Sequence, residues 1–201
     1  MKTKLLYVVT FLVTSFSLTS QNLLNNWTHG SGSTTGFSQN GSTSENRRTY
    51  IGDPFNYYGT GWIASPDAVS GPDGGWNSDF KYVPDNKKTY RLTVWIKKTG
   101  TNSGTTYFGT DSDRGYKTIL NLNGTTNSNP YFWSGDLPQL NKWYLLVGYV
   151  HGSNYNSTIS YGGIYDPISG DKVLSITDFK FESSALNIRH RAYLFYDTNT
   201  S

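Results

Sequence analysis

The sequence predicts an all-β protein, an antiparallel β-sandwich of the jelly-roll type with about ten strands. Short runs of alternating or β-branched and aromatic residues recur along the chain, and Gly, Asn, Asp and Pro separate them. The composition combines 16 Tyr, 10 Phe and 6 Trp with 21 Gly and only 15% charged residues, which is typical of a β-sandwich with long loops. No stretch after residue 20 has sustained helical periodicity.

The first 20 residues have the layout of a secretory signal peptide. Lys2 and Lys4 precede an apolar run that ends at Val13, and small and hydroxyl residues end the segment at Ser20. The apolar run is too short to span a membrane. We therefore expect cleavage after residues 1–20 and export of residues 21–201 to the outside, the periplasm or the cell surface, without further membrane association.

The charge and the cysteine count exclude two classes of protein. Two of the 17 basic residues and none of the 14 acidic residues lie in residues 1–20, so residues 21–201 carry a net charge of about +1. Nucleic-acid binding requires a larger basic excess. The sequence contains no cysteine, so neither disulfides nor thiolate zinc sites stabilise the fold. The length of residues 21–201 fits a single domain with a packed core.

The expected strands follow the alternating runs. They lie at 47–51, 79–83, 89–98, 105–110, 117–122, 131–133, 142–151, 157–165, 171–176, 178–183 and 188–197. Residues 25–46 are rich in Gly, Ser, Thr and Asn, and they are either a loose leader or a first strand. Residues 52–78 are predicted to form a long functional loop, whose aromatic rings include Trp62 and Trp76.

The strand at 89–98 has two contrasting faces. The alternate positions 90, 92, 94 and 96 are apolar and predict the side that faces the core. The opposite side then carries Arg91, Trp95 and Lys97. A large apolar ring between two cations indicates a binding surface on the outside of the sheet.

The strand at 188–197 repeats this pattern. Its core side carries His190, which we expect to be a buried, hydrogen-bonded structural histidine, and its other side carries Arg189, Arg191 and Tyr193. If this strand, the strand at 89–98 and the strand that ends at His151 share one sheet, an aromatic platform forms inside a ring of hydrogen-bond donors.

Such a platform suits a polysaccharide. The apolar face of a pyranose stacks on an aromatic ring, and arginine binds a sulfate or carboxylate group with two parallel hydrogen bonds. The predicted ligand is therefore a polysaccharide, and an anionic or sulfated glycan fits best. The alternative is that both strand faces are buried and the arginines pair with Asp178, Glu182 or Asp197. Trp62 and Trp76 are additional candidate ligand contacts, although covering the core is the expected role of the loop aromatics.

Catalysis has little support in the sequence. Glycoside hydrolysis needs two facing carboxyl groups, and neither of the two glutamates lies in an acidic cluster. The HExxH, GxSxG and P-loop motifs are absent from the sequence. A polysaccharide lyase is the one enzymatic alternative, with His151 and Tyr149 for proton abstraction and Arg191 as the stabilising cation.

No cofactor is predicted, with a structural calcium ion as the alternative. Loop carboxylates and carbonyls supply the oxygen ligands that calcium prefers, and the candidates are Asp53, Asp73, Asp111, Asp113 and the turn at 166–171. The segment DPISGD at 166–171 is better explained as a hairpin turn, because Pro and Gly occupy turn positions.

Several segments together resemble one family. They are SENRR at 44–48, SPDA at 65–68, DGGWN at 73–77, YRLTVWIKKT at 90–99, GTTYFGT at 104–110, NPYFWSGDLPQLNKWYLLVGYVHG at 129–152, YGGIYDPISGDKV at 161–173 and IRHRAYLFYDT at 188–198. Over most of residues 22–201 the chain is similar to a β-sandwich module of secreted proteins from polysaccharide-degrading bacteria and of phage-type tail fibres. The resemblance implies a lectin-like or carbohydrate-binding-module fold and binding without catalysis.

We therefore predict a secreted, non-catalytic carbohydrate-binding module. Its partners are a polysaccharide and, by the same resemblance, a linked or associated glycan-degrading enzyme. Two alternatives remain, which are a structural or adhesin-type module of a fibre or surface assembly and the polysaccharide lyase.

Overall fold

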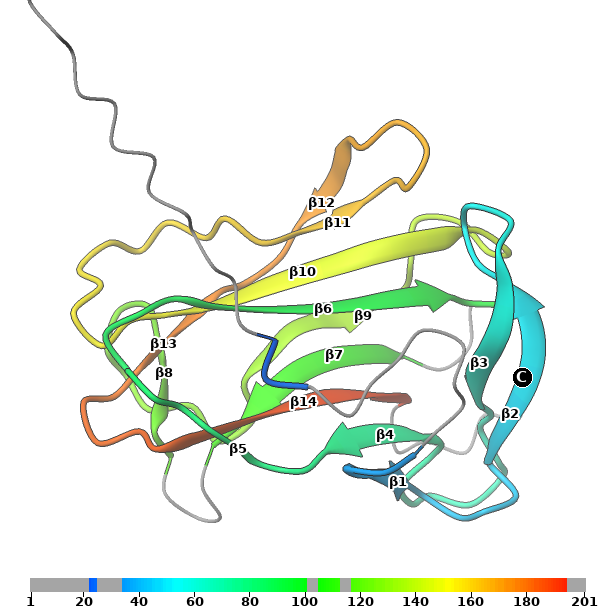
Figure 1. Cartoon of the computed structure of the whole chain (residues 1–201), viewed down its shortest axis with the longest axis horizontal. Helices are drawn as coiled ribbons and strands as arrows, with labels where there is room; N and C mark the ends of the chain where they lie inside the picture. The colour runs from blue at the N-terminus through cyan, green and yellow to red at the C-terminus, as the bar shows by residue number, and fades with distance from the viewer. Residues whose placement is uncertain (1–21, 25–33, 101–104, 113–116, 195–201) are drawn as a thin grey trace, which may run out of the picture.

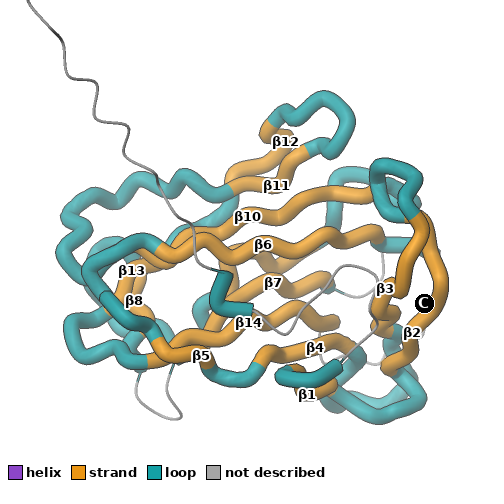
Figure 2. Tube along the Cα trace, in the orientation of Figure 1, coloured by secondary structure: helices purple, strands orange, loops and turns teal. Residues whose placement is uncertain are grey.

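The computed structural model describes residues 22–24, 34–100, 105–112 and 117–194 (Figure 1). These residues form 14 strands and no helix (Figure 2). The predicted all-β class is confirmed, with more strands than the ten or so expected. Within the described ranges no helix is long and apolar enough to cross a membrane. The expected signal peptide lies outside them.

The strands form two six-stranded sheets and a ribbon. The first sheet has the order β1 (Phe37–Asn40), β4 (Gly75–Ser78), β14 (Asn187–Leu194), β7 (Thr106–Asp111) and β9 (Tyr131–Gly135), and β5 (Lys81–Tyr82) also pairs with β14. The second sheet has the order β12 (Lys172–Ser175), β11 (Gly163–Tyr165), β10 (Trp143–His151), β13 (Phe179–Phe181) and β8 (Ile119–Asn121), and β6 (Tyr90–Lys97) also pairs with β10. The ribbon consists of β2 (Asn46–Gly52) and β3 (Tyr58–Ala64).

Both sheets contribute side chains to one hydrophobic core. The ring of Phe132 on β9 lies 5.0 Å from that of Phe108 on β7 and 5.3 Å from that of Phe179 on β13, measured between centroids. A Cβ added to Gly148 of β10 would lie 2.4 Å from Cγ of Phe132, so the ring packs directly on the backbone of β10. Burial of such rings is the main stabilising term in a chain without disulfides.

The predicted alternation of the strand at 89–98 is confirmed. Leu92 of β6 is buried in the core, and Tyr90, Val94 and Ile96 pack against it. Arg91 and Trp95 are exposed on the opposite side.

The prediction of one long loop at 52–78 is wrong, because β3 and β4 lie within it. One of its glycines, Gly61, lies inside a strand and allows close packing there. A Cβ on Gly61 of β3 would lie 2.4 Å from Cγ2 of Ile51 on β2.

Two further expectations differ from the structure in where the strands begin and end. Strand 157–165 is reduced to β11, and the loose segment 25–46 contains β1, with 25–33 outside the described residues.

His190 of β14 connects the first sheet to β6, which has no second strand neighbour among the described residues. Its Nε2 lies 3.0 Å from the carbonyl oxygen of Thr93. A carbonyl only accepts, so Nε2 carries the proton and donates. Burial lowers the pKa of His190 to about 4. The expected hydrogen bond of His190 is confirmed, but the residue is half-buried and not fully buried.

Asp178 joins the segment before β11 to β10. Its carboxylate is fully buried and accepts hydrogen bonds from the backbone N–H groups of Tyr149 (3.0 Å), Tyr161 (2.6 Å) and Gly162 (3.1 Å). Nε2 of His151 lies 3.2 Å from the same carboxylate. Asp178 directly precedes β13, the only described strand that pairs parallel with β10. Its side chain therefore joins the start of β13 to β10 and to the segment before β11.

The lowered pKa of His190 predicts a loss of stability in acid. The unfolded chain takes up a proton at this ring near pH 6.5, whereas the folded chain does so only near pH 4. The free energy of unfolding should therefore fall as the pH falls from about 6.5 to 4, by about 2 kcal/mol after allowance for the partly exposed ring. His190→Gln keeps a donor for Thr93 but does not titrate. Urea unfolding at pH 7.5 and 4.5 should give a smaller acid loss for this variant, and an equal loss would contradict the role of His190.

Replacement of Asp178 should destabilise the protein strongly. Asp178→Asn places an NH2 group against backbone N–H donors, so we expect the free energy of unfolding to fall by about 3 kcal/mol. Asp171→Asn is the control, since Asp171 is exposed and lies nearby in the sequence. Urea unfolding at neutral pH measures both variants. Similar stability of the two variants would show that the Asp178 carboxylate is not required.

Candidate functional site

The outer side of the second sheet carries a row of aromatic rings. Leu145 of β10 lies in register with Trp95 of β6 on one side and with Tyr165 of β11 on the other. In-register neighbours project from the same side of a sheet, so Trp95 and Tyr165 share one face, two strand spacings or about 10 Å apart. We call this surface the Trp95 face. It consists of Arg91, Thr93, Trp95, Lys97, Trp143, Leu145, Tyr165 and Lys172.

The turn of the β2–β3 ribbon flanks this face. Trp95 is 38% exposed, and the ring of Phe55 stands edge-on to it with 5.7 Å between centroids. The carboxylate of Asp53 accepts the backbone N–H of Phe55 at 2.8 Å and so fixes the turn. Nε1 of Trp143 donates to the carbonyl oxygen of Gly52 at 3.1 Å, which attaches the turn to β10. Trp95 is therefore open to solvent beside a fixed aromatic neighbour.

Cations lie beside the other rings of the Trp95 face. Nζ of Lys97 is 5.2 Å from the centroid of Trp143, and Nζ of Lys172 is 5.8 Å from that of Tyr165. Lys172 also donates to the carbonyl oxygen of Tyr161 at 2.8 Å. These contacts hold ammonium groups next to aromatic surface.

The condition that the strand at 188–197 shares a sheet with Trp95 is not met, so Arg189, Arg191 and Tyr193 do not belong to the Trp95 face. They lie on β14, which pairs with β4 and β7 in the first sheet. Tyr193 is only 4% exposed, and its hydroxyl accepts a hydrogen bond from Nη2 of Arg191 at 2.6 Å. Alternation in a sequence gives the two faces of a strand but not the sheet that the strand joins.

Arg189 pairs with an acidic residue, as the alternative interpretation expected, but with a different one. Its Nη2 lies 3.2 Å from Oδ2 of Asp111. Burial lowers the pKa of Arg189, and Asp111 opposes this shift. Of the expected partners, Asp178 binds backbone N–H groups instead, and Asp197 lies outside the described residues.

His151 lies beneath the surface and not on the Trp95 face. It is 5% exposed, and its ring stacks on Tyr155 with 4.1 Å between centroids. His151 and Tyr149 lie on β10, while Arg191 lies in the other sheet. The three residues of the lyase hypothesis are therefore divided between two sheets.

Trp62 and Trp76 pack against each other with 4.6 Å between centroids, and both are half-buried. Trp62 also contacts the ring of Phe37 on β1. This position fits the expected core cover. Two other rings of the supposed loop, Tyr57 and Tyr58, are 69% and 66% exposed.

The position of Tyr165 on the Trp95 face and of Phe55 beside it was not predicted. The partner of Phe55 depends on how the ribbon packs, which no local pattern contains. The alternation of β10 was the available signal for Trp143, because Trp143 and Leu145 alternate with Tyr144 and Leu146, which face the core.

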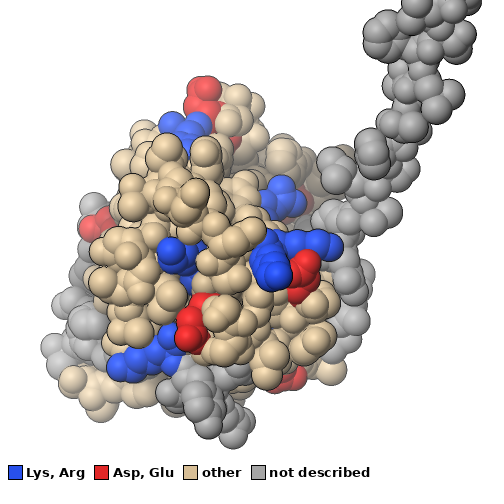
Figure 3. Space-filling model, turned by 90° about the vertical axis from the view of Figure 1, so that its left-hand side faces the viewer, with Lys and Arg blue, Asp and Glu red and all other residues tan. Residues whose placement is uncertain are grey.

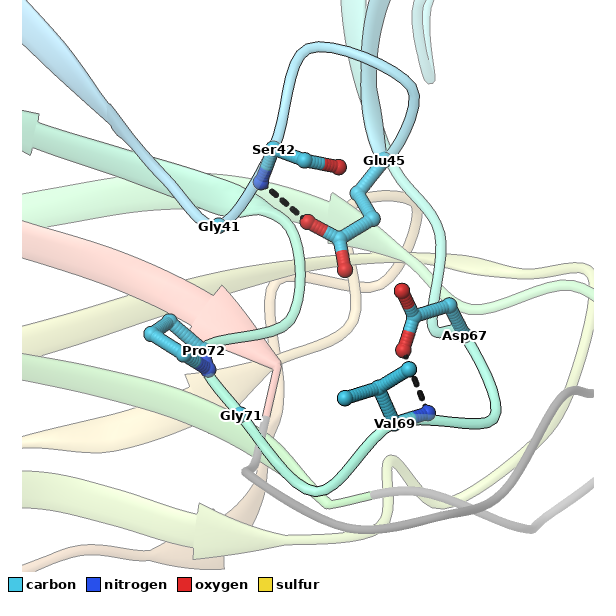
Figure 4. A pocket seen from close by; sticks show the side chains of 7 residues that line it. All are labelled: Gly41, Ser42, Glu45, Asp67, Val69, Gly71 and Pro72. Carbon is cyan, nitrogen blue, oxygen red and sulfur yellow. Dashed lines mark hydrogen bonds between the residues drawn. The ribbon is translucent and has the colours of Figure 1, made fainter.

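A second group of side chains could hold a metal ion. Glu45, Asp67 and Asp73 place carboxylate oxygens within 4.8 Å of one another, and they are the one such group of three among the described residues. Glu45 and Asp67 line a pocket of about 320 Å³, where their carboxylates lie close together (Figure 4). The N–H of Ser42 donates to Glu45, and that of Val69 donates to Asp67 at 2.7 Å. Such oxygen ligands suit a divalent cation.

Of the predicted calcium ligands, only Asp73 belongs to this group. Asp53 caps its own turn and Asp111 pairs with Arg189. Asp166 accepts a hydrogen bond from Nζ of Lys142 at 2.5 Å, which is the main reason why its pKa is lowered. Asp113 lies outside the described residues.

On the side of the molecule drawn in Figure 3, basic and acidic side chains are interspersed among neutral ones. The chain matches no family model, no curated protein and no solved structure. The similarity to carbohydrate-binding modules stays a prediction from the sequence, so the function must be argued from the geometry of these surfaces.

Proposed function

We propose that this protein is an exported, non-catalytic carbohydrate-binding module with a jelly-roll β-sandwich fold, and that the Trp95 face binds polysaccharide. The observation that carries the proposal is the position of Trp95. Its large ring is 38% exposed on the outside of a sheet and stands beside Phe55, which is 52% exposed. Exposed rings of this size are costly unless they meet a ligand or a partner.

The arrangement of the rings suits a chain of sugars better than a single sugar. Trp95 and Tyr165 lie two strand spacings apart on one face, about 10 Å, with the lower side chain of Leu145 between them. A glycan that crosses the strands can stack on both rings. The flanking turn with Phe55 limits the face on one side.

The charges of the face favour an anionic glycan. Arg91, Lys97 and Lys172 belong to the Trp95 face, and none of the other residues that define this face is acidic. Ammonium and guanidinium groups bind sulfate and carboxylate groups with charge-assisted hydrogen bonds.

A structural or adhesin-type role is the second candidate. Ile168, Val173 and Leu174 of the β11–β12 hairpin are 78%, 41% and 37% exposed. The outer edge of β12 has no strand partner among the described residues. An exposed apolar edge strand is a surface on which another protein chain can pair.

Trp95→Ala tests the carbohydrate proposal. Affinity electrophoresis in gels that contain neutral, carboxylated or sulfated polysaccharide should show retardation of the native protein, strongest with an anionic polymer. The variant should lose at least about tenfold in affinity because the stacking platform is removed. Its free energy of unfolding should change by less than about 1 kcal/mol, since the ring is partly exposed.

Arg191→Gln is the matched control, because it removes a large polar side chain from the other sheet. We expect retardation of this variant to equal that of the native protein. Unchanged retardation of Trp95→Ala, or a loss with Arg191→Gln, would contradict the Trp95 face as the site. Absence of retardation of the native protein by every polymer would favour the adhesin-type role.

A further inference from the structure

The ammonium group of Lys172 is held in one position on the Trp95 face. Its Nζ donates to the carbonyl oxygen of Tyr161 at 2.8 Å and to that of Gly162 at 3.1 Å. The backbone N–H groups of the same two residues donate to the fully buried carboxylate of Asp178. The ammonium is therefore attached to a piece of backbone that is itself fixed from within the sheet.

A glycine makes room for the stem of Lys172. Gly163 of β11 lies in register with Val147 of β10, and Val147 lies in register with Thr93 of the Trp95 face. A Cβ on Gly163 would lie 2.8 Å from Cγ and Cε of Lys172 and 2.9 Å from its Cδ. The stem thus lies against the backbone of β11, and a side chain at position 163 would displace it.

The charge of this ammonium is not compensated. Lys98 and Lys142 form ion pairs with Asp136 and Asp166, but no carboxylate of the described residues pairs with Lys172. A lysine ammonium has three donors, and the two carbonyl groups accept from two of them. Since Lys172 is exposed, its third donor and its positive charge are available to a ligand.

The position of the ammonium relative to Tyr165 suits a substituted sugar. Nζ of Lys172 lies 5.8 Å from the centroid of the Tyr165 ring. A sugar ring that stacks on Tyr165 lies about 4 Å from it, so an anionic group on that sugar comes within reach of the third donor. Binding would cost little side-chain entropy, because the rotamer of Lys172 is already fixed by folding.

We propose that Lys172 is a specificity-determining residue of the Trp95 face, and that it binds the anionic group of the sugar unit that stacks on Tyr165. The inference rests on the proposed polysaccharide binding at this face and locates the anionic group on the glycan. One donor and a point charge do not distinguish a carboxylate from a sulfate ester. Uronic acids and sulfated sugars therefore share the chemistry that this contact recognises.

Lys172→Met tests the contact, because it removes the ammonium and keeps an unbranched stem against Gly163. Affinity electrophoresis uses dextran, carboxymethyl dextran and dextran sulfate, and a second series uses galactan, polygalacturonate and carrageenan. The native protein should be retarded most by an anionic polymer. The variant should lose at least about tenfold in affinity for that polymer and keep its affinity for the neutral member of the series. Retention of the anionic preference would overturn the proposal.

Lys180→Met is the matched control. Lys180 also lies on the outer side of the second sheet, in register with His151, and its Nζ donates to the backbone carbonyl of Tyr155 at 3.3 Å. This variant removes the same charge outside the Trp95 face, so affinity for the anionic polymer should fall less than about twofold. An equal loss in Lys172→Met and Lys180→Met would show that only net charge matters and would overturn the role of Lys172. Urea unfolding should give the same stability for both variants and the native protein.

Trp95→Ala separates this proposal from the one above. It should weaken retardation by neutral and anionic polymers alike, because it removes stacking and not the anionic contact. Loss of retardation in Trp95→Ala with an unchanged anionic preference in Lys172→Met would overturn only the inference about Lys172. Full retardation of Trp95→Ala with loss of the anionic preference in Lys172→Met would contradict only the role of Trp95. Absence of retardation of the native protein by all six polymers would overturn both proposals, and preference for a single anionic chemistry would identify the group as carboxylate or sulfate.

Discussion

The contact between Phe132 and Gly148 is the constraint on which the second sheet depends. The ring of Phe132 on β9 occupies the space that a side chain at position 148 of β10 would need, so the register of β10 relative to the core is fixed. Tyr144, Leu146 and Val150 then face the core, and Leu145 faces outward. A slip of one residue would turn every side chain of a strand to the opposite face. The orientation of Trp95 and Tyr165, both in register with Leu145, is therefore a consequence of core packing.

The sequence predicted what depends on local alternation and missed what depends on long-range pairing. The two faces of β6 and the hydrogen-bonded role of His190 follow from a period of two, so both were accessible. The placement of β14 in the other sheet was not, because the pairing of β14 with β4 and β7 joins segments far apart in the chain. Within 52–78, glycine at strand positions such as Gly61 concealed β3. The cluster of carboxylates from Glu45, Asp67 and Asp73 was also missed, because it forms only when three separate segments of the chain meet.

The separation of Arg189 and Arg191 from the Trp95 face changes how a glycan would be recognised. Arg191 is held over the rings of Tyr131 and Tyr193, and Arg189 is held by Asp111. Of the three cations on the Trp95 face, two are lysines, which act as point charges and do not select planar anions by a fixed pair of donors. The nature of the anionic group should therefore influence binding less than ring stacking and total charge.

The outer side of the second sheet is not an open surface beyond the Trp95 face. His151, Lys180 and Leu120 follow one another in register from β10 to β8. Between the Trp95 face and β8, Tyr155 stacks on His151, and Nζ of Lys180 donates to the carbonyl oxygen of Tyr155 at 3.3 Å. These side chains occupy the surface that a flat, continuous ligand would need. A glycan bound on the Trp95 face would thus need a branch or a bend to continue along the sheet as far as β8.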